Sequence, residues 1–328
     1  MAEFVTAVAH SNIALAKYWG KRQVQGNLPA VGSLSMTLSG LYTRTSVRLN
    51  PSLNQHTIWV VDAEAPNAFA ERSKHFIDTV RQMVDSDAYV EVRTENTFPT
   101  GAGLASSASG FAALALATTE AYGVKLSPRE LSGLARTGSG SASRSLFGGF
   151  VEWHRGALED GSDSVAEPIA GPDHWDVRML VVITSEAEKQ HSSTDGMNLT
   201  RDTSPYYDAW LSTSPQTLKD MKAAVLARNF DRVGELTESS CLQMHAVMLS
   251  ARPGLLYWNP ATVALIHAVR AERAAGLGCY FTIDAGPQVK ILCRPEHVER
   301  LRERIENVPG VIRILEAAPG PDARVERA

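Results

Sequence analysis

A glycine- and serine-rich segment, PTGAGLASSAS at positions 99–109, constrains the fold of this chain more than any other feature. A β-like run precedes it and a small, apolar helical stretch follows it. Gly101 and Gly103 let backbone N–H groups approach an anion closely, and a helix start adds unpaired donors and partial positive charge. This arrangement suits a triphosphate, although its spacing matches neither a P-loop nor a dinucleotide fingerprint. The alternative is an ordinary helix entry capped by Ser106 and Ser107.

Hydrophobic patterning along the 328 residues predicts an α+β fold. Alternating or continuous short apolar runs indicate strands, and apolar residues at helical spacing indicate helices. We expect strands at 6–9, 43–49, 89–93, 149–154, 179–184, 280–283, 289–293 and 311–315, and helices at 76–84, 105–122, 127–137, 218–228, 230–249, 260–275 and 296–307. Ser204 and Pro205 pattern as a further helix start, 156–172 as a loop, and the last eight residues as a frayed end.

The composition excludes several classes of function. Lys and Arg total 32 against 36 Asp and Glu, a net charge of −4, which disfavours a nucleic-acid binder. The sequence contains no apolar run long enough for a membrane span and no secretory leader. Three Cys without a CxxC pair indicate reduced thiols, and the scattered His residues predict no zinc site. We therefore expect a cytoplasmic protein that contacts neither nucleic acid nor membrane.

Two charged residues stand in unusual surroundings. Asp284 follows a predicted buried strand and opens an Asp-Ala-Gly-Pro turn, a place where loops present functional side chains on a rigid frame. The alternative is an ordinary turn-forming Asp. Lys17 lies in an apolar and aromatic context at 14–19, where burial is costly unless the ammonium is paired. Its alternative is a lysine that snorkels to solvent.

The chain resembles the GHMP kinase superfamily at the glycine-rich segment, and within it the diphosphomevalonate decarboxylases. Further motifs narrow the match and follow the family's order over about residues 5–315. They are NIALAKYWGK at 12–21, GSGSASRS at 138–145, SSTDGM at 192–197, TSP at 203–205 and DAGP at 284–287.

The resemblance implies a reaction and a division of roles. The family decarboxylates (R)-5-diphosphomevalonate with ATP, giving isopentenyl diphosphate, ADP, phosphate and CO2 in isoprenoid biosynthesis. It implies Asp284 as the base facing the tertiary hydroxyl and Lys17 as a cation beside Asp284 and the transferring phosphoryl group. The residues implied as substrate ligands are Tyr18, Lys21, Ser139, Gly140, Ser141, Arg144 and Met197. Lys21 could instead be a solvated charge, and the serines ordinary turn residues.

The resemblance also implies the architecture and the cofactors. It predicts a two-lobed GHMP kinase fold, with a ribosomal protein S5 domain 2-like nucleotide-binding lobe at residues 1–180 and a C-terminal GHMP lobe carrying the Asp at 181–328. ATP would bind along Asn96, Gly101, Gly103, Leu104, Ala105, Ser106 and Ser107, with Mg²⁺ held mainly by the nucleotide rather than by protein ligands. A homodimer is expected.

Two positions depart from the family pattern. Ser143 stands where many relatives carry Cys, and Thr194 where some bacterial relatives carry Arg near the substrate. The second departure leaves open a decarboxylase for monophosphomevalonate or a 3-kinase that does not decarboxylate. An ordinary small-molecule GHMP kinase and a nucleotide-binding regulator without turnover are the remaining alternatives.

Overall fold

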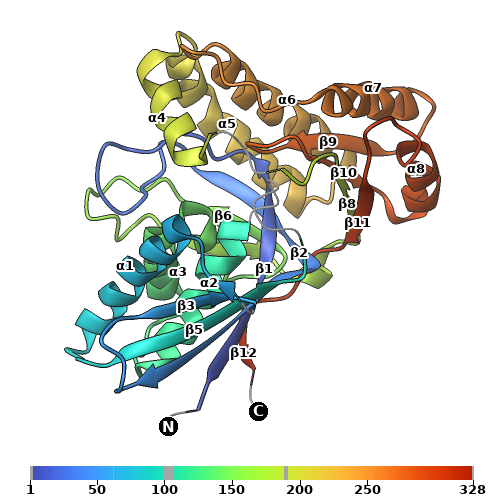
Figure 1. Ribbon diagram of the computed structural model, residues 1–328. Coiled ribbons are helices and arrows are strands. Elements are labelled where there is room, and N and C mark those ends of the chain that lie inside the picture. Colours follow the sequence, from blue (N-terminus) through green and yellow to red (C-terminus); the bar gives the residue numbers. More distant parts are fainter. Residues whose placement is uncertain (1–2, 62, 99–105, 188–190, 327–328) are drawn as a thin grey trace.

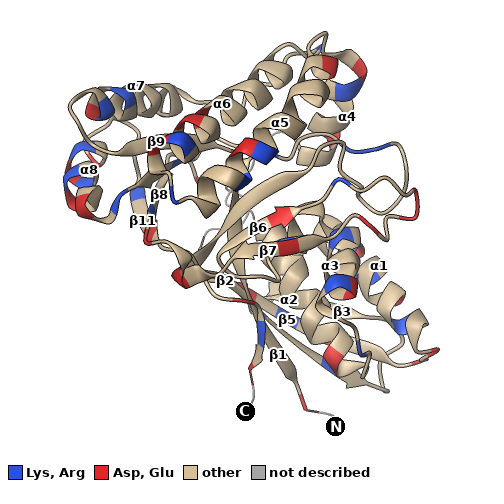
Figure 2. Ribbon diagram, turned by 180° about the vertical axis from the view of Figure 1, so that it is seen from behind, with Lys and Arg blue, Asp and Glu red and all other residues tan. Residues whose placement is uncertain are grey.

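The computed structural model describes residues 3–61, 63–98, 106–187 and 191–326. These residues form two parts, each built on its own sheet, and the α+β class expected from the sequence is confirmed (Figure 1). We call them the large-sheet part and the small-sheet part. Lys and Arg are interspersed with Asp and Glu over both parts (Figure 2). No helix within the described ranges is long and apolar enough to cross a membrane.

The large-sheet part is organised around two long antiparallel strands, β1 (Val5–Ala16) and β2 (Ser33–Asn50). Both strands are buried along most of their length, because elements that follow them in the sequence pack against them. The strand order is β12-β1-β2-β5-β3-β4, with β6 joining β2 and β7 joining β6. The other strands are β3 (Thr57–Val60), β4 (Ala63–Glu64), β5 (Tyr89–Asn96), β6 (Phe150–Trp153), β7 (Ala166–Ala170) and β12 (Arg324–Glu326).

Three helices pack against this sheet: α1 (Asn67–Met83), α2 (Ser106–Ala121) and α3 (Pro128–Gly138). The small residues of α2 allow it to lie close to β1 and β2, and most of its residues are buried. The helix start predicted at Ser127 is confirmed as a capping box. The Ser127 hydroxyl accepts from the Glu130 amide, and the Glu130 carboxylate accepts from the Ser127 amide.

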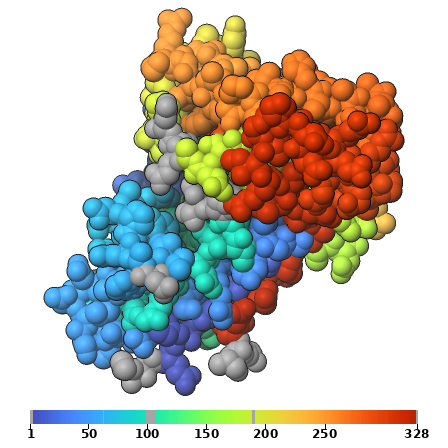
Figure 3. All heavy atoms as spheres, turned by 45° about the vertical axis from the view of Figure 1, so that its right-hand side comes forward, coloured from blue at the N-terminus to red at the C-terminus, as the bar shows by residue number. Residues whose placement is uncertain are grey.

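The small-sheet part has four antiparallel strands in the order β11-β8-β10-β9. One face packs on the helices α7 and α8 and the other on a core shared with β1 and β2. In the space-filling view most of the C-terminal residues form one mass and the N-terminal residues another, while the last red residues lie against the N-terminal mass (Figure 3). The elements are β8 (Arg178–Ile183), β9 (Cys279–Ile283), β10 (Val289–Cys293), β11 (Arg313–Ala317), α4 (Ser193–Thr203), α5 (Tyr207–Leu226), α6 (Phe230–Leu249), α7 (Pro260–Ala274) and α8 (Val298–Ile305).

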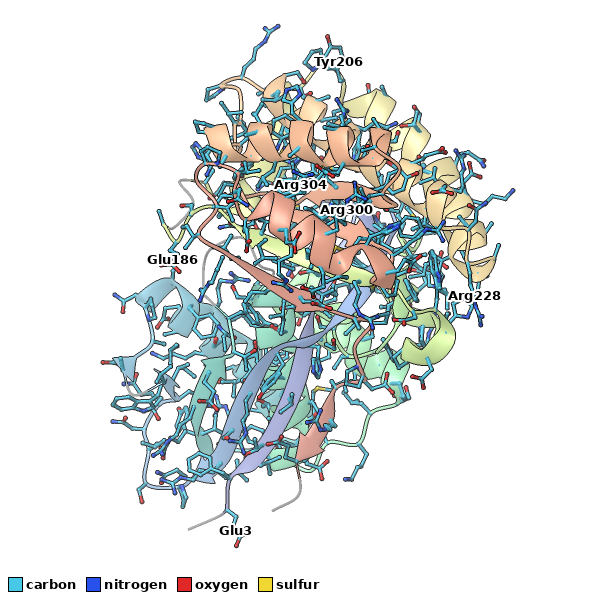
Figure 4. All side chains as sticks on the ribbon, turned by 90° about the vertical axis from the view of Figure 1, so that its right-hand side faces the viewer. Glu3, Glu186, Tyr206, Arg228, Arg300 and Arg304 are labelled. Carbon is cyan, nitrogen blue, oxygen red and sulfur yellow. The ribbon has the colours of Figure 1, made fainter. Side chains whose placement is uncertain are left out.

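Helix α8 shows how the spacing of apolar residues decides which face of a helix packs against the sheet. Leu301 and Ile305 are fully buried against the sheet, whereas Arg300 and Arg304 are exposed and point outward (Figure 4). Apolar residues four apart lie on one helical face, which leaves the charged residues between them in solvent.

Three expectations about secondary structure are wrong. The predicted loop at 156–172 contains strand β7, which pairs with β6. The predicted frayed end contains β12, which pairs with β1, placing Val8 opposite Arg324. Ser204 and Pro205 do not begin a helix, because Ser204 ends α4 and α5 begins at Tyr207.

Helix α5 also starts well before the position expected for it. It continues through Pro215, a residue that removes one backbone donor and usually interrupts a helix. Trp210 and Met221 on either side of Pro215 are buried in hydrophobic clusters. Burial of these side chains outweighs the local cost, which a sequence pattern cannot register.

Candidate active site

A cleft of about 1430 Å³ is lined by residues from both parts of the chain. Its lining includes the end of β1 and the segment after it, the 3-10 turn Gly140–Ser143 (η1), the start of α4 and the turn after β9. These segments are far apart in sequence, so the cleft exists only because the small-sheet part packs on β1 and β2.

Asp284 occupies the first position after β9, in a turn that is held at several points. The Gly286 amide donates to the Asp284 carbonyl at 2.8 Å, and the Gln288 side-chain oxygen accepts from the Thr184 amide at 2.6 Å. The Thr262 hydroxyl donates to the Pro287 carbonyl at 2.6 Å. The side chain of Asp284 is 28% exposed and lines the cleft. The turn therefore presents one carboxylate toward the cavity on a fixed frame.

Lys17 reaches this carboxylate from the other part of the chain. It follows the last residue of β1, and its backbone amide donates to the Ser240 hydroxyl on α6 at 2.9 Å. Its ammonium nitrogen lies 2.6 Å from Asp284 Oδ1. Lys17 is only 2% exposed, so it does not snorkel to solvent. The two residues predicted to meet across a shared cavity do so.

A second lysine, Lys290 on β10, contacts the other oxygen of the same carboxylate. Its Nζ lies 3.2 Å from Asp284 Oδ2, and the side chain is completely buried. Burial opposes the ionised form of Asp284, but the two neighbouring ammonium groups prevail and hold the pKa of this carboxyl below its ordinary value. Burial also lowers the pKa of Lys290. Asp284 is consequently an ionised acceptor held by two cations.

Arg144 and Tyr18 form a polar wall of the cleft that is backed by Trp153. The Arg144 guanidinium is buried, donates to Asn12 Oδ1 at 3.1 Å and to the Ser33 hydroxyl, and lies over the Trp153 ring. Burial lowers the pKa of Arg144 to about 10. The Tyr18 ring meets Trp153 edge-on, and its buried hydroxyl has no partner within the described structure. A cation without a carboxylate partner and a hydroxyl without any partner suit an anionic ligand.

The turn η1 supplies the predicted serines and Gly140. Gly140 is packed so closely that an added Cβ would lie 2.9 Å from the Tyr18 hydroxyl and 2.8 Å from Trp153. The Ser141 carbonyl accepts from the Asn12 side-chain amide at 3.1 Å. Ser139 and Ser141 line the cleft together with Gly140. Only glycine leaves room for a ligand to approach the backbone here.

Lys21 lies at a more exposed end of the cleft and is held by neutral groups. Its ammonium donates to Asn27 Oδ1 at 2.7 Å and to the hydroxyl of Thr194 on α4 at 2.9 Å. Burial and the nearby Arg72 lower the pKa of Lys21 to about 8, while Asp195 opposes this shift. Thr194, which stands where some relatives carry Arg, therefore gives Lys21 an oxygen acceptor. An arginine at this position would repel the Lys21 ammonium instead.

The nucleotide-binding predictions fall partly outside the described residues. Gly101, Gly103, Leu104 and Ala105 lie outside them. Ser106 and Ser107 open helix α2 and line the cleft, and Ser107 accepts a hydrogen bond from Ser139 at 3.3 Å. Asn96 ends β5 and accepts from the Thr43 hydroxyl at 2.6 Å, and it is not among the described residues that line the cleft. Met197 on α4 lines it and packs in a cluster with Trp19 and Trp210.

Within the described ranges, no group of three or more His, Cys, Asp or Glu is placed to hold a metal ion. His245 is buried, and burial lowers its pKa to about 3. Its Nε2 lies 3.2 Å from the Ile283 carbonyl, so it is a structural residue behind the Asp284 turn. Many of the other polar groups that line the cleft are hydroxyls, amides and cations, which suit phosphate oxygens, although the carboxylates of Glu71, Glu159 and Asp160 line it as well.

Sequence reasoning missed three residues of this site. Lys290 had a detectable signal, because a lysine within the apolar run of β10 is expensive to bury. Asn27 and Arg72, which line the cleft near Lys21, had none. An asparagine in a loop and an arginine on an amphipathic helix are ordinary surface residues until the fold brings them together.

Comparisons with known proteins place the chain in one family. The profile of the diphosphomevalonate decarboxylase-like N-terminal domain matches residues 9–166, and that of the mevalonate 5-diphosphate decarboxylase C-terminal domain matches residues 179–316. A diphosphomevalonate decarboxylase from Ganoderma lucidum is 38% identical over 322 residues, covering 92% of this chain and 80% of the relative.

Solved structures show the same similarity over the whole fold. The mevalonate diphosphate decarboxylase of Staphylococcus aureus superposes with a TM-score of 0.94 at 37% identity, covering 100% of this chain and 99% of that one. A protein designated MDDEF, solved with MVAPP, AMPPCP and magnesium, superposes with a TM-score of 0.91 at 38% identity, covering 99% of both chains.

Proposed function

The chain belongs to the diphosphomevalonate decarboxylase family, and from that premise we propose how its own residues carry out the reaction. The reaction is the ATP-dependent decarboxylation of (R)-5-diphosphomevalonate to isopentenyl diphosphate, ADP, phosphate and CO2. The observation that carries the proposal is the 2.6 Å contact between Lys17 and Asp284 in a cleft large enough for both substrates.

Asp284 acts on the tertiary hydroxyl of the substrate. As the hydroxyl oxygen bonds to the γ-phosphorus, the bond from that phosphorus to the β-phosphate oxygen breaks, ADP leaves, and the hydroxyl proton passes to Asp284. Two ammonium groups make Asp284 a weak base, but phosphoryl transfer through a loose transition state needs little proton abstraction before bond formation. Orientation of the hydroxyl is the main contribution of this carboxylate.

Lys17 and the fixed polarity of the cleft stabilise charge in the second stage. Phosphate departs from the tertiary carbon, and the bond to the carboxylate carbon then breaks, supplies the electron pair of the double bond and releases CO2. Negative charge accumulates on the departing phosphate, and the buried ammonium of Lys17 lies where it offsets that charge.

The diphosphate and carboxylate of the substrate bind along the opposite wall. Arg144 offers guanidinium donors and Tyr18 a free hydroxyl, while Gly140 leaves room for the ligand to reach the backbone. Lys21 binds the more exposed end of the substrate. Ser139, Ser141 and Met197 complete this wall.

ATP occupies the part of the cleft next to α2. Ser106 and Ser107 line it, and the start of helix α2 offers unpaired backbone donors to the phosphates. These hard oxygen donors fit a Mg²⁺ ion that arrives on the triphosphate, where it neutralises charge on the phosphate oxygens. The relative solved with MVAPP, AMPPCP and magnesium supports this assignment.

Three finer points belong to the same proposal. The chain divides functionally into a nucleotide-binding lobe at residues 1–180 and a lobe carrying Asp284 at 181–328. It acts in the cytoplasm, and it forms a homodimer. Separate expression, fractionation and analytical ultracentrifugation test these points in turn.

A substrate panel with separate ADP and CO2 readouts tests the function. Diphosphomevalonate should release ADP and CO2 in equal amounts, and monophosphomevalonate and mevalonate should be poorer substrates. ADP release without CO2 would identify a kinase instead. Faster CO2 release from monophosphomevalonate would move the substrate assignment to the other phosphorylation state left open by Thr194.

A further inference from the structure

Lys290 is a buried lysine that enters the proposed reaction only as one of the two cations that make Asp284 a weak base. It lies on β10 opposite Val181 of β8 and Thr282 of β9. Leu292, two residues along the strand on the same face, belongs to the hydrophobic core shared with β1 and β2. Lys290 therefore projects toward a largely apolar layer, where an apolar side chain would be cheaper to bury.

Lys290 and Lys17 together contact both oxygens of the Asp284 carboxylate. Its ammonium lies 3.2 Å from Asp284 Oδ2 and 3.3 Å from the Gln288 carbonyl. Lys17 lies 2.6 Å from Asp284 Oδ1. With one cation on each oxygen, rotation of the carboxylate about its Cβ–Cγ bond would break a charge-assisted hydrogen bond. The plane of the Asp284 carboxylate is thereby fixed.

The two lysines differ in what else they can contact. Lys17 and Asp284 line the cleft, whereas Lys290 is not among the described residues that do so and is 0% exposed. A ligand in the cleft can contact Lys17 directly. Lys290 lies behind Asp284 and can act on a ligand only through that carboxylate.

The charge balance of the cluster is also uneven. Two ammonium groups face one carboxylate in a buried position, which is a poor arrangement for stability alone. It becomes favourable when a polyanion enters the cleft and the surplus positive charge is compensated.

We propose that Lys290 is a positioning residue, which orients the Asp284 carboxylate toward the substrate hydroxyl and contributes a buried positive charge to the transfer step. This inference rests on the proposed function. A positioning role differs from a structural role, in which Lys290 would contribute mainly to the stability of the fold.

Lys290→Met tests the distinction because methionine fills similar space without the charge. Loss of one charge-assisted hydrogen bond to Asp284 should lower kcat about ten- to hundredfold. KM for diphosphomevalonate and for ATP should stay close to wild type, since Lys290 contacts neither. The thermal unfolding midpoint should be equal to or above that of wild type, because the surplus buried cation has been removed.

Leu292→Ala is the matched control from the same strand and face. It should lower the unfolding midpoint by leaving a cavity and leave kcat of the folded enzyme unchanged. Lys290→Gln is the second variant if the methionine variant does not fold, and it should show the same loss of kcat at constant KM.

The outcomes separate this inference from the proposed function. Absence of CO2 release by the wild-type enzyme would contradict the function itself. An active wild type with normal kcat in both Lys290 variants would overturn the positioning role. The positioning role would also be overturned if the Lys290 variants lost stability and kcat together, and Leu292→Ala showed the same loss of kcat for the same loss of stability.

Discussion

Two lysines four residues apart, Lys17 and Lys21, meet opposite conditions at the two ends of one cleft. Lys17 is buried and bound to a carboxylate that a further lysine also holds. Lys21 is bound by two neutral oxygens, from Asn27 and Thr194, and its pKa falls to about 8. The same residue type thus gives a cation paired with a carboxylate at one end and a cation held by neutral oxygens at the other.

Lys17 and Lys21 differ in the groups that their ammonium nitrogens contact, and not only in how deeply they are buried. Burial disfavours a charged ammonium at both positions, and only an opposite charge compensates that cost fully. Because the carboxylate of Asp284 is supplied by the small-sheet part, the buried end of the cleft depends on both parts being in place. At the exposed end, the small-sheet part contributes the Thr194 hydroxyl of α4 to Lys21, and Asn27 supplies the second oxygen.

The largest effect should come from breaking the buried end. Asp284→Ala removes the group that orients the hydroxyl and accepts its proton, so we expect kcat to fall about a hundred- to ten-thousandfold. ATP affinity, measured with a fluorescent nucleotide, should be retained. Asp208→Ala, at an exposed position on α5, is the control and should be fully active. A rate near wild type for Asp284→Ala would remove this residue from the mechanism.

A third cation sharpens the comparison, because Arg144 is buried and the hydrogen-bond partners of its guanidinium among the described residues, Asn12 and Ser33, are neutral. Arg144→Ala should raise KM for diphosphomevalonate about ten- to hundredfold through loss of charge-assisted hydrogen bonds. Steady-state kinetics with each substrate varied in turn measures this. Nucleotide affinity should change little, and Arg144→Lys should recover part of the loss. An equal loss of affinity for both substrates would mean that the anion assignment is misplaced.

The exposed end should respond to pH in a way that the buried end does not. Lys21 is protonated below its pKa of about 8, so KM for diphosphomevalonate should rise as the pH increases through that value. Binding of the anion raises the pKa of Lys21, so calorimetry in two buffers should detect proton uptake. Lys21→Arg should flatten the profile, since arginine stays charged. A rise in KM that persists in Lys21→Arg would assign the titration to another group.

The smallest effect should come from the contact between Lys21 and Thr194. Thr194→Val removes a hydroxyl acceptor at nearly constant shape, and a neutral hydrogen bond of this kind corresponds to about 0.5–1.5 kcal/mol. We expect a few-fold change in KM for diphosphomevalonate, with kcat unchanged. Thr213→Val on α5, whose hydroxyl bonds only within its own helix, should change neither constant. A fall in kcat would show that Thr194 acts on the chemical step.

The sequence anticipated the buried end better than the exposed end. Asp284 and Lys17 belong to family motifs, and Lys17 also lies in an apolar and aromatic context where an unpaired lysine is costly to bury. The contact between Lys21 and Thr194 joins residues 173 positions apart through ordinary polar side chains. No periodicity or composition marks such a pair, because its partners are defined only by the fold.

Secondary structure was likewise predictable where its contacts are local and unpredictable where they join distant parts of the chain. The capping box at Ser127 was predictable because all its contacts are local. Strand β12 was not, since its charged residues read as a solvated end and only the distant β1 gives them a pairing partner. Helix α5 was misplaced because burial of Trp210 outweighs the breaker at Pro215.

The pairing of β12 with β1 has a consequence for dissecting this molecule. The backbone crosses from one part to the other between β7 and β8 and returns between β11 and β12. A fragment cut after residue 180 would leave the outer rim of β1 at Thr6–Val8 with unsatisfied amides and carbonyls, the kind of sheet edge that recruits other chains. Co-expressing the missing strand as a short peptide would be the remedy to try before concluding that such a fragment cannot fold.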